Sequence, residues 1–319
     1  MLRIKSISIK KIGAKGFLRT LLRGWLGLGL IGTLVNCSPV VPLRGLSTET
    51  LPPAPSPSTP SHTPSQTTFR VIPSPTRPTP TPCGAARLES HTIEPTPIGK
   101  PLRFQVYLPP CYNPQATPGY PVLYLLHGQG SDETLWLALG LTETLDRLVQ
   151  AHQVKPFLVV MPHEEYALRN PQESAFGQTL IEVLVPWIET HFSVCRERGC
   201  RALGGISRGA GWALHLGIQH GDQFIAIGAH SPAPFWGDDL RLYYRAAELP
   251  ADQWPRFYLD SGDRDRYLQA VLAFVDRLSN LGLPYEWHLN AGEHDVAYWR
   301  VHLEDYLRWY AAQWQIPSP

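Results

Sequence analysis

The stretch Gly205-Ile206-Ser207-Arg208-Gly209 decides how the rest of the chain is interpreted. It follows a short apolar run, Arg201-Ala202-Leu203-Gly204, and it opens a helix-like segment that begins at Ala210. A serine between two glycines, at a sharp turn from a strand into a helix, is typical of a nucleophile elbow. The glycines let the strand and the helix approach closely, and the turn lifts the hydroxyl off the sheet. The pattern therefore predicts a nucleophilic serine at position 207, above the amides of a helix N-terminus.

Apolar runs of strand length alternate with helical patterns from about residue 85 onward. The predicted strands are 88–93, 102–108, 122–126, 157–161, 201–206, 224–229, 256–260 and 285–289. The predicted helices are 134–151, 176–192 with a kink at Pro186, 210–216, 266–281 and 296–313. This alternation indicates an α/β fold with a mostly parallel central sheet and helices on both faces. The first two strands have a short connection, so we expect them to form an antiparallel hairpin at the sheet edge.

A serine hydroxyl is a weak nucleophile, so the chemistry requires a base and a third group that orients the base. His294 lies on the loop before the last predicted helix, where a base would stand at the carboxyl end of the sheet. The loop after strand 256–260 offers Asp265, which we favour as the acid, and Asp263 as the alternative. Either aspartate could instead cap the helix that follows. The order serine, acid, histidine is that of doubly wound hydrolases.

The negative oxygen that forms on a carbonyl under attack needs N–H donors aimed at it. One predicted donor is the amide of Arg208, which directly follows the nucleophile. The other is expected from the glycine-bearing turn after strand 122–126, with Gln129 favoured and Gly128 as the alternative. His127, at the start of this turn, is interpreted mainly as a residue that holds the turn by hydrogen bonds.

Aromatic and histidine side chains follow several of the predicted strand ends, and they could line a substrate cleft. For each tryptophan, packing in the core is an equally good interpretation. His163 also follows a strand end. The chemistry requires neither a metal ion nor an organic cofactor. The candidate cleft residues are His127, Trp136, His230, Phe235, Trp236 and Trp299.

Four segments together resemble a family of esterases: Tyr124-Leu125-Leu126-His127-Gly128-Gln129-Gly130, the serine motif, Gly262-Asp263-Arg264-Asp265, and Gly292-Glu293-His294-Asp295. The family includes esterase D, enterochelin esterases, feruloyl esterase domains and mycobacterial mycolyltransferases, and the resemblance covers residues 88–309. It implies the α/β-hydrolase fold, with the acid three residues after a glycine, which corresponds to Asp265. Glu293 departs from the family's second glycine before the histidine, and Arg208 stands where methionine is common.

The first 82 residues have the composition of an export signal followed by a linker. Residues 1–36 combine a basic leader with an apolar run at 25–35, which is shorter than a membrane-spanning helix. Cys37 follows this run as the lipidated cysteine of bacterial lipoproteins does, although Asn36 replaces the usual small residue, and cleavage without lipidation is the alternative. In residues 38–82, 29 of 45 residues are Pro, Ser or Thr, which favours an extended linker. The predicted division is therefore signal 1–36, linker 37–82 and catalytic domain 83–319.

The cysteine count also favours an oxidising compartment. Four cysteines remain beside Cys37, and they could pair as Cys83 with Cys111 and Cys195 with Cys200. Sequence alone leaves the connectivity open, and free buried thiols are the alternative.

Charge excludes some function classes, since 28 Lys and Arg residues nearly balance 27 Asp and Glu residues. There is no basic footprint for nucleic acid, and the only predicted membrane contact is the N-terminal anchor. The predicted function is an exported, cell-surface serine hydrolase that cleaves a small-molecule or polysaccharide carboxylic ester. Acyl transfer to a sugar or lipid hydroxyl would use the same residues, and a non-catalytic tethered binding module is the second alternative.

Overall fold

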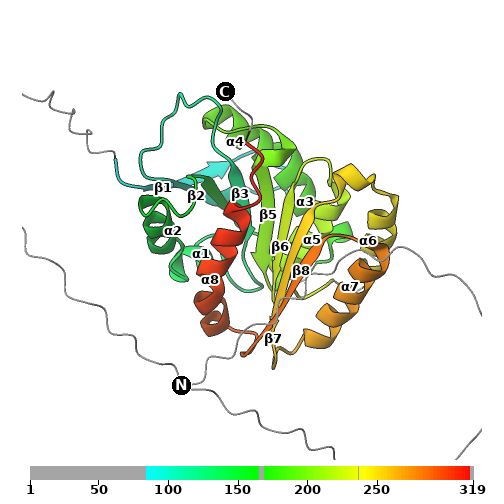
Figure 1. The fold of residues 1–319 in the computed structure, drawn as a ribbon. Helices are drawn as coiled ribbons and strands as arrows, with labels where there is room; N and C mark the ends of the chain where they lie inside the picture. The colour runs from blue at the N-terminus through cyan, green and yellow to red at the C-terminus, as the bar shows by residue number, and fades with distance from the viewer. Residues whose placement is uncertain (1–83, 165–168, 236, 317–319) are drawn as a thin grey trace, which may run out of the picture. The chain divides into compact units, whose positions relative to one another are not determined.

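One eight-stranded sheet forms the centre of the domain, with the strand order β1-β2-β4-β3-β5-β6-β7-β8 (Figure 1). The computed structural model describes residues 84–164, 169–235 and 237–316, so the predicted signal and the predicted linker lie outside the described residues. The strands are β1 (Arg87–Ile93), β2 (Leu102–Leu108), β3 (Val122–Leu126), β4 (Leu158–Pro162), β5 (Arg201–Ile206), β6 (Ala226–His230), β7 (Arg256–Gly262) and β8 (Tyr285–Asn290).

The pairing of the strands confirms the predicted α/β class. β4, β3, β5, β6, β7 and β8 run parallel to one another, and β1 and β2 form the expected antiparallel edge hairpin. β2 is also antiparallel to β4. β3 and β5 are buried along their whole lengths, as expected for central strands that are covered on both faces. The carboxyl ends of six parallel strands therefore lie along one edge of the sheet.

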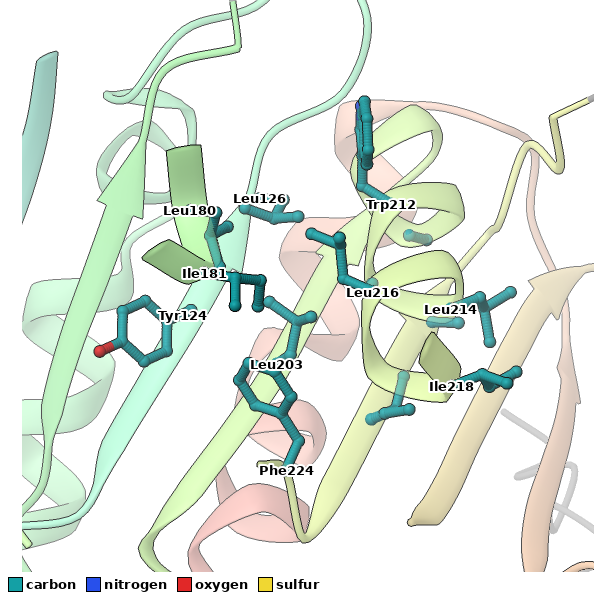
Figure 2. Packing of buried hydrophobic residues seen from close by; sticks show 14 of the residues in the cluster. Tyr124, Leu126, Leu180, Ile181, Leu203, Trp212, Leu214, Leu216, Ile218 and Phe224 are labelled. Atoms are coloured by element: carbon teal, nitrogen blue, oxygen red, sulfur yellow. The ribbon is translucent and has the colours of Figure 1, made fainter. Parts of the chain in front are cut away.

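Helices cover both faces of the sheet (Figure 1). They are α1 (Leu135–Ala138), α2 (Leu141–Gln150), α3 (Phe176–Thr179), α4 (Val185–His191), α5 (Arg208–Gln219), α6 (Asp238–Glu248), α7 (Leu268–Leu281) and α8 (Val296–Ala311). The side chains of α1, α2 and α8 share one buried cluster, and those of α3 to α7 share another. Figure 2 shows part of the second cluster, where Trp212 and Leu216 of α5 lie over Leu126 and Leu203 of the central strands.

Three helical predictions were incomplete. The predicted helix 134–151 breaks at Gly140, whose φ of 96° belongs to the left-handed region that favours glycine. The predicted helix 176–192 does not simply kink at Pro186. Instead a π-helical turn, Leu180–Leu184, joins α3 to α4, because proline offers no N–H to an α-helical ladder. The sequence analysis missed α6 altogether, although six of its eleven residues are Leu, Tyr or Ala.

The loop between α4 and β5 is closed by a disulfide. Cys195 and Cys200 are bonded to each other, with their Cα atoms 5.8 Å apart. Cys111 is also disulfide-bonded, and its predicted partner, Cys83, lies outside the described residues. Cys37 lies outside them as well. None of the helices in the described part of the chain is long and apolar enough to cross a membrane.

Candidate active site

The turn at Ser207 joins the end of β5 to the start of α5, and its backbone is strained. Ser207 has φ 54° and ψ −120°, a conformation that non-glycine residues rarely adopt. The flanking glycines are required by close packing. A Cβ on Gly209 would lie 2.5 Å from the carbonyl oxygens of Leu126 and His127, and a Cβ on Gly205 would overlap the backbone of Gly209. The sequence motif therefore folds as predicted, with the serine at the tip of a tight strand-to-helix turn.

The imidazole of His294 lies between Ser207 and Asp265. His294 Nε2 is 2.8 Å from Ser207 Oγ, and His294 Nδ1 is 2.9 Å from Asp265 Oδ2. The three residues come from loops at the ends of β5, β7 and β8, which are far apart along the chain. Because the Nδ1–H group donates to the carboxylate, Nε2 carries the lone pair that can accept the serine proton.

Asp265 and Asp263 have different surroundings. The side chain of Asp265 is fully buried and accepts hydrogen bonds from His294 and from the Tyr267 backbone N–H, the latter at 2.8 Å. Burial alone would raise the pKa of the Asp265 carboxyl, but these hydrogen bonds and the nearby imidazole outweigh burial and hold its pKa below the ordinary value. Asp263 is half-exposed, accepts from the Gly292 N–H at 3.0 Å and pairs with Arg264.

Two aromatic rings fix the orientation of the imidazole. Tyr267, at the start of α7, meets the His294 ring edge-on with the centroids 4.9 Å apart. Trp299, on α8, meets it edge-on at 5.2 Å and is itself buried. Ring contacts of this kind are favourable when the edge of one ring approaches the face of another. They restrict rotation of the imidazole away from the serine.

The loop after β3 lies against Ser207, the candidate nucleophile. A Cβ on Gly128 would be 3.4 Å from the Cβ of Ser207, so the next residue, Gln129, is carried close to the serine. Arg208 is the first residue of α5, where backbone N–H groups point out of the helix N-terminus. The two predicted amide donors thus belong to segments that meet at Ser207.

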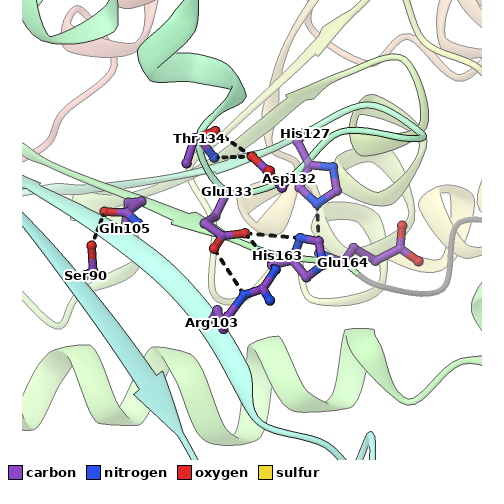
Figure 3. A network of polar contacts seen from close by, with 9 residues as sticks. All are labelled: Ser90, Arg103, Gln105, His127, Asp132, Glu133, Thr134, His163 and Glu164. Atoms are coloured by element: carbon purple, nitrogen blue, oxygen red, sulfur yellow. Dashed lines mark hydrogen bonds and ion pairs between the residues drawn. The ribbon is translucent and has the colours of Figure 1, made fainter.

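His127 holds this loop from below through both of its ring nitrogens. Its Nδ1–H donates to the Gly128 carbonyl at 2.8 Å, and its Nε2 accepts from the Glu164 N–H at 2.8 Å (Figure 3). The ring must be neutral to make both bonds, and burial lowers the pKa of His127, which favours the neutral form. Its ring also stacks on His163, whose Nδ1 lies 3.2 Å from a Glu133 carboxylate oxygen.

A buried ion pair lies directly beside the serine turn. The Arg208 guanidinium donates to both carboxylate oxygens of Glu164, at 2.7 and 2.9 Å, and to the Arg169 carbonyl at 2.6 Å. The same guanidinium lies over the Phe235 ring, 4.8 Å from its centroid. Both charged side chains are less than one-tenth exposed. Glu164 therefore connects Arg208 to His127, which holds the loop after β3.

Comparison with known proteins assigns a family to this arrangement. The sequence pattern of the family described as "Putative esterase" matches residues 96–310, which is most of the chain. The chain belongs to this esterase family. The match confirms the family resemblance that the serine, acid and histidine motifs predicted.

Individual relatives are distant and longer than the matched region. An endo-1,4-beta-xylanase/feruloyl esterase of Xylanibacter ruminicola is 28% identical over 222 aligned residues, in a match that covers 65% of this chain and 29% of that protein. An esterase of Mycobacterium tuberculosis is 26% identical over 264 residues, covering 65% of this chain and 56% of that protein. The chain therefore spans 29% to 56% of the length of these curated relatives.

Solved structures confirm the fold. A ferulic acid esterase superposes with a TM-score of 0.63 at 24% identity, covering 72% of this chain and 100% of that chain. The S-formylglutathione hydrolase FrmB of Staphylococcus aureus superposes with a TM-score of 0.60 at 23% identity, covering 72% of this chain and 98% of that chain. The predicted α/β-hydrolase fold is therefore confirmed for this esterase-family chain.

Several candidate cleft residues lie in the interior instead of lining a cleft. His230 is fully buried, and its two ring nitrogens bond to Asp260 and Tyr310. Trp136 is buried and donates its indole N–H to the Leu126 carbonyl. His230 is the last residue of the central strand β6, and Trp136 lies on α1, with its indole packed into one of the two buried clusters. Neither prediction as a cleft residue holds.

The remaining candidates have structural contacts near the site. His127 is buried and serves the loop, as its alternative interpretation stated, and Phe235 is buried against the Arg208 guanidinium and Trp212. Trp299 packs on the imidazole, and Trp236 lies outside the described residues. In the described ranges, no group of three or more His, Cys, Asp or Glu side chains is arranged to hold a metal ion.

The sequence analysis did not predict two residues that contact the candidate active site. Glu164 follows β4, and its role depends on a partner 44 positions away, which no local pattern reveals. Tyr267 contacts His294 across 27 positions. The sequence did hold one signal for Glu164, which is Arg208 directly after Ser207. An arginine that is buried at such a turn needs a carboxylate partner.

The buried pair predicts an asymmetric response to charge removal. Glu164→Gln should lower the free energy of unfolding by roughly 3 kcal/mol, because it leaves the buried Arg208 cation without a counter-charge. Glu248→Gln is the matched control, since the side chains of Glu248 and its partner Arg245 are both exposed, and it should cost less than about 1 kcal/mol. Urea denaturation of both variants measures the difference. Equal losses would contradict the assigned role of the pair.

Proposed function

We propose that this chain is an exported serine hydrolase that cleaves a carboxylic ester through Ser207, His294 and Asp265. The observation that carries the proposal is the continuous contact from Ser207 Oγ to His294 Nε2 and from His294 Nδ1 to Asp265. Membership of the esterase family supports the same reaction class. Feruloyl esterase and acetyl esterase are among the names of its relatives, so feruloyl and acetyl esters are the first substrates to test.

The geometry supports a two-step reaction. His294 Nε2 takes the proton as Ser207 Oγ attacks the ester carbonyl, and the Asp265 carboxylate stabilises the imidazolium that forms. The amides of Arg208 and Gln129 donate to the tetrahedral oxyanion. The imidazolium then protonates the leaving alcohol, which departs and leaves an acyl group on the serine. Water, deprotonated by His294, attacks this acyl-enzyme and releases the acid.

Export is proposed from the first 82 residues. The basic leader, the apolar run, Cys37 and the linker rich in Pro, Ser and Thr together favour a lipid-anchored domain held away from a membrane surface. A bonded cysteine pair within the domain is compatible with an oxidising compartment.

Removal of the nucleophile tests the reaction. Ser207→Ala should reduce turnover of p-nitrophenyl acetate by at least about 10³-fold and abolish labelling by a fluorophosphonate probe, with an unchanged circular dichroism spectrum. Ser90→Ala, on the far edge strand β1, is the matched control and should retain both activities. Retained turnover in Ser207→Ala would refute the proposal. Product analysis with an added acceptor alcohol separates hydrolysis from acyl transfer.

The two aspartates can be separated by the same assay. Asp265→Asn should reduce kcat by about 10³ to 10⁴-fold, because an amide can present an N–H to His294 and favour the wrong tautomer. Asp263→Asn keeps an oxygen that can accept from Gly292 and should lose less than about 10-fold. Measured kcat values decide between them, and the reverse order would assign the acid to Asp263.

Lipid anchoring has its own test in the full-length chain made in a bacterial host. Cys37→Ser should abolish incorporation of radiolabelled palmitate and release the domain from the membrane fraction, because the thiol is the site of acylation. Ser47→Ala, within the linker, is the control and should stay in that fraction. A Cys37→Ser variant that remains membrane-bound would contradict a lipid anchor.

A further inference from the structure

The catalytic histidine proposed above sits on a short loop that needs its own support. His294 belongs to the five-residue connection 291–295 between β8 and α8. Most of this loop is exposed or half-exposed, and its backbone is held at Gly292, whose N–H donates to Asp263 and whose carbonyl accepts from the Arg264 N–H. Yet the imidazole must stay within hydrogen-bonding distance of two other loops. A side chain that ties this connection to the sheet would keep the imidazole in place.

Tyr298 contacts the connection at three places. Asn290, the last residue of β8, donates its amide N–H to the Tyr298 hydroxyl at 3.1 Å. Asp295, which caps α8, accepts from the Tyr298 backbone N–H at 2.9 Å. A Cβ on Gly292 would lie 2.5 Å from the Tyr298 ring, so the middle of the loop rests on the ring itself. One residue therefore holds both ends and the middle of the loop.

The Tyr298 hydroxyl is in turn anchored to a buried carboxylate. It donates to Asp260 Oδ2 at 2.7 Å. Burial, followed by the negative charge of Asp260, raises the pKa of Tyr298, so the hydroxyl keeps its proton and remains a donor. Asp260 is fully buried in β7 and also accepts from His230 and Tyr306. Three donors on a buried carboxylate leave it little freedom to move.

The position of Asp260 connects this anchor to the rest of the site. Asp260 lies near the end of β7, and Asp265 lies five residues later, on the loop that follows this strand. Tyr298 thus links the strand that leads to the acid with the loop that carries the base. A displacement of the loop by about 1 Å would separate the imidazole from both of its partners, which can cost about 10²-fold in rate.

We propose that Tyr298 is a positioning residue for His294, and that its hydrogen bond to Asp260 sets the distance between the base and the nucleophile. The inference rests on the proposed function, because it assigns a role within that same site. Tyr298 touches neither the serine nor the position of the substrate carbonyl. It acts through the loop alone, so its removal should change the rate of the chemical step and leave substrate binding unaltered.

The chain contains a matched control for this role. Tyr306 also donates to Asp260 Oδ2, at 2.8 Å, and it lies on α8 two turns beyond Tyr298. Tyr306 is fully buried, and none of its hydrogen bonds or ring contacts reaches residues 291–295. Removal of either hydroxyl takes one donor from the same carboxylate oxygen. Only the Tyr298 hydroxyl also bonds to Asn290, so only its removal takes away an attachment at the start of the loop.

The experiment compares Tyr298→Phe with Tyr306→Phe in the otherwise intact chain. Both variants should unfold at a lower temperature than the wild type, because each leaves Asp260 with one donor fewer. Tyr298→Phe should lower kcat for p-nitrophenyl acetate about 10-fold with KM within about twofold of the wild type. Tyr306→Phe should keep kcat within about twofold. The rate of Ser207 labelling by a fluorophosphonate probe should follow the same order.

Each outcome bears on one of the two proposals. Wild-type kcat in Tyr298→Phe, or an equal loss in Tyr306→Phe, overturns the positioning role and leaves the proposed function intact. Absence of both turnover and Ser207 labelling in the wild type overturns the proposed function itself. If Tyr298→Phe fails to fold, Asn290→Ala releases the other end of the same contact and should lower kcat with KM unchanged; an unchanged kcat there also overturns the role.

Discussion

The strained backbone at Ser207 is the constraint on which the rest of the site depends. A positive φ at a serine is tolerated only when the surrounding structure determines it, and here β5 and α5 pack closely through Gly205 and Gly209. The same close packing carries the loop after β3 against the serine. The positions of Ser207, the first turn of α5 and the loop after β3 are therefore set by one local geometry.

Buried polar contacts support this geometry from two sides. Next to the loop after β3, Glu164 bonds to Arg208 through its carboxylate and to His127 through its backbone N–H. Next to the loop that carries His294, the Asp260 carboxylate accepts hydrogen bonds from the His230 imidazole and from the Tyr298 hydroxyl. Buried charges are costly unless they are fully partnered, so each of these carboxylates holds its neighbours in a narrow range of positions.

Much of the architecture could be predicted because it is encoded in short-range patterns. Continuous apolar runs marked the buried strands, and alternation with helical periods indicated a parallel sheet. Predictions failed where packing overrode the local pattern. The break at Gly140 and the π-helical turn before Pro186 are backbone adjustments that periodicity cannot register. His230 follows the pattern of a cleft residue, yet the Tyr310 hydroxyl and Asp260 enclose it within the core.

The sequence by itself determined the α/β class, the family resemblance and the positions of the serine, histidine and acid candidates. These depend on residues close together in the chain, where turn geometry and hydrophobic period act directly. Only the tertiary structure separated Asp265 from Asp263 by their contacts, and only it revealed Glu164, Tyr267 and Tyr298 around the site. Their partners lie on other strands and helices, and a side chain's burial and hydrogen bonds are decided where distant segments meet.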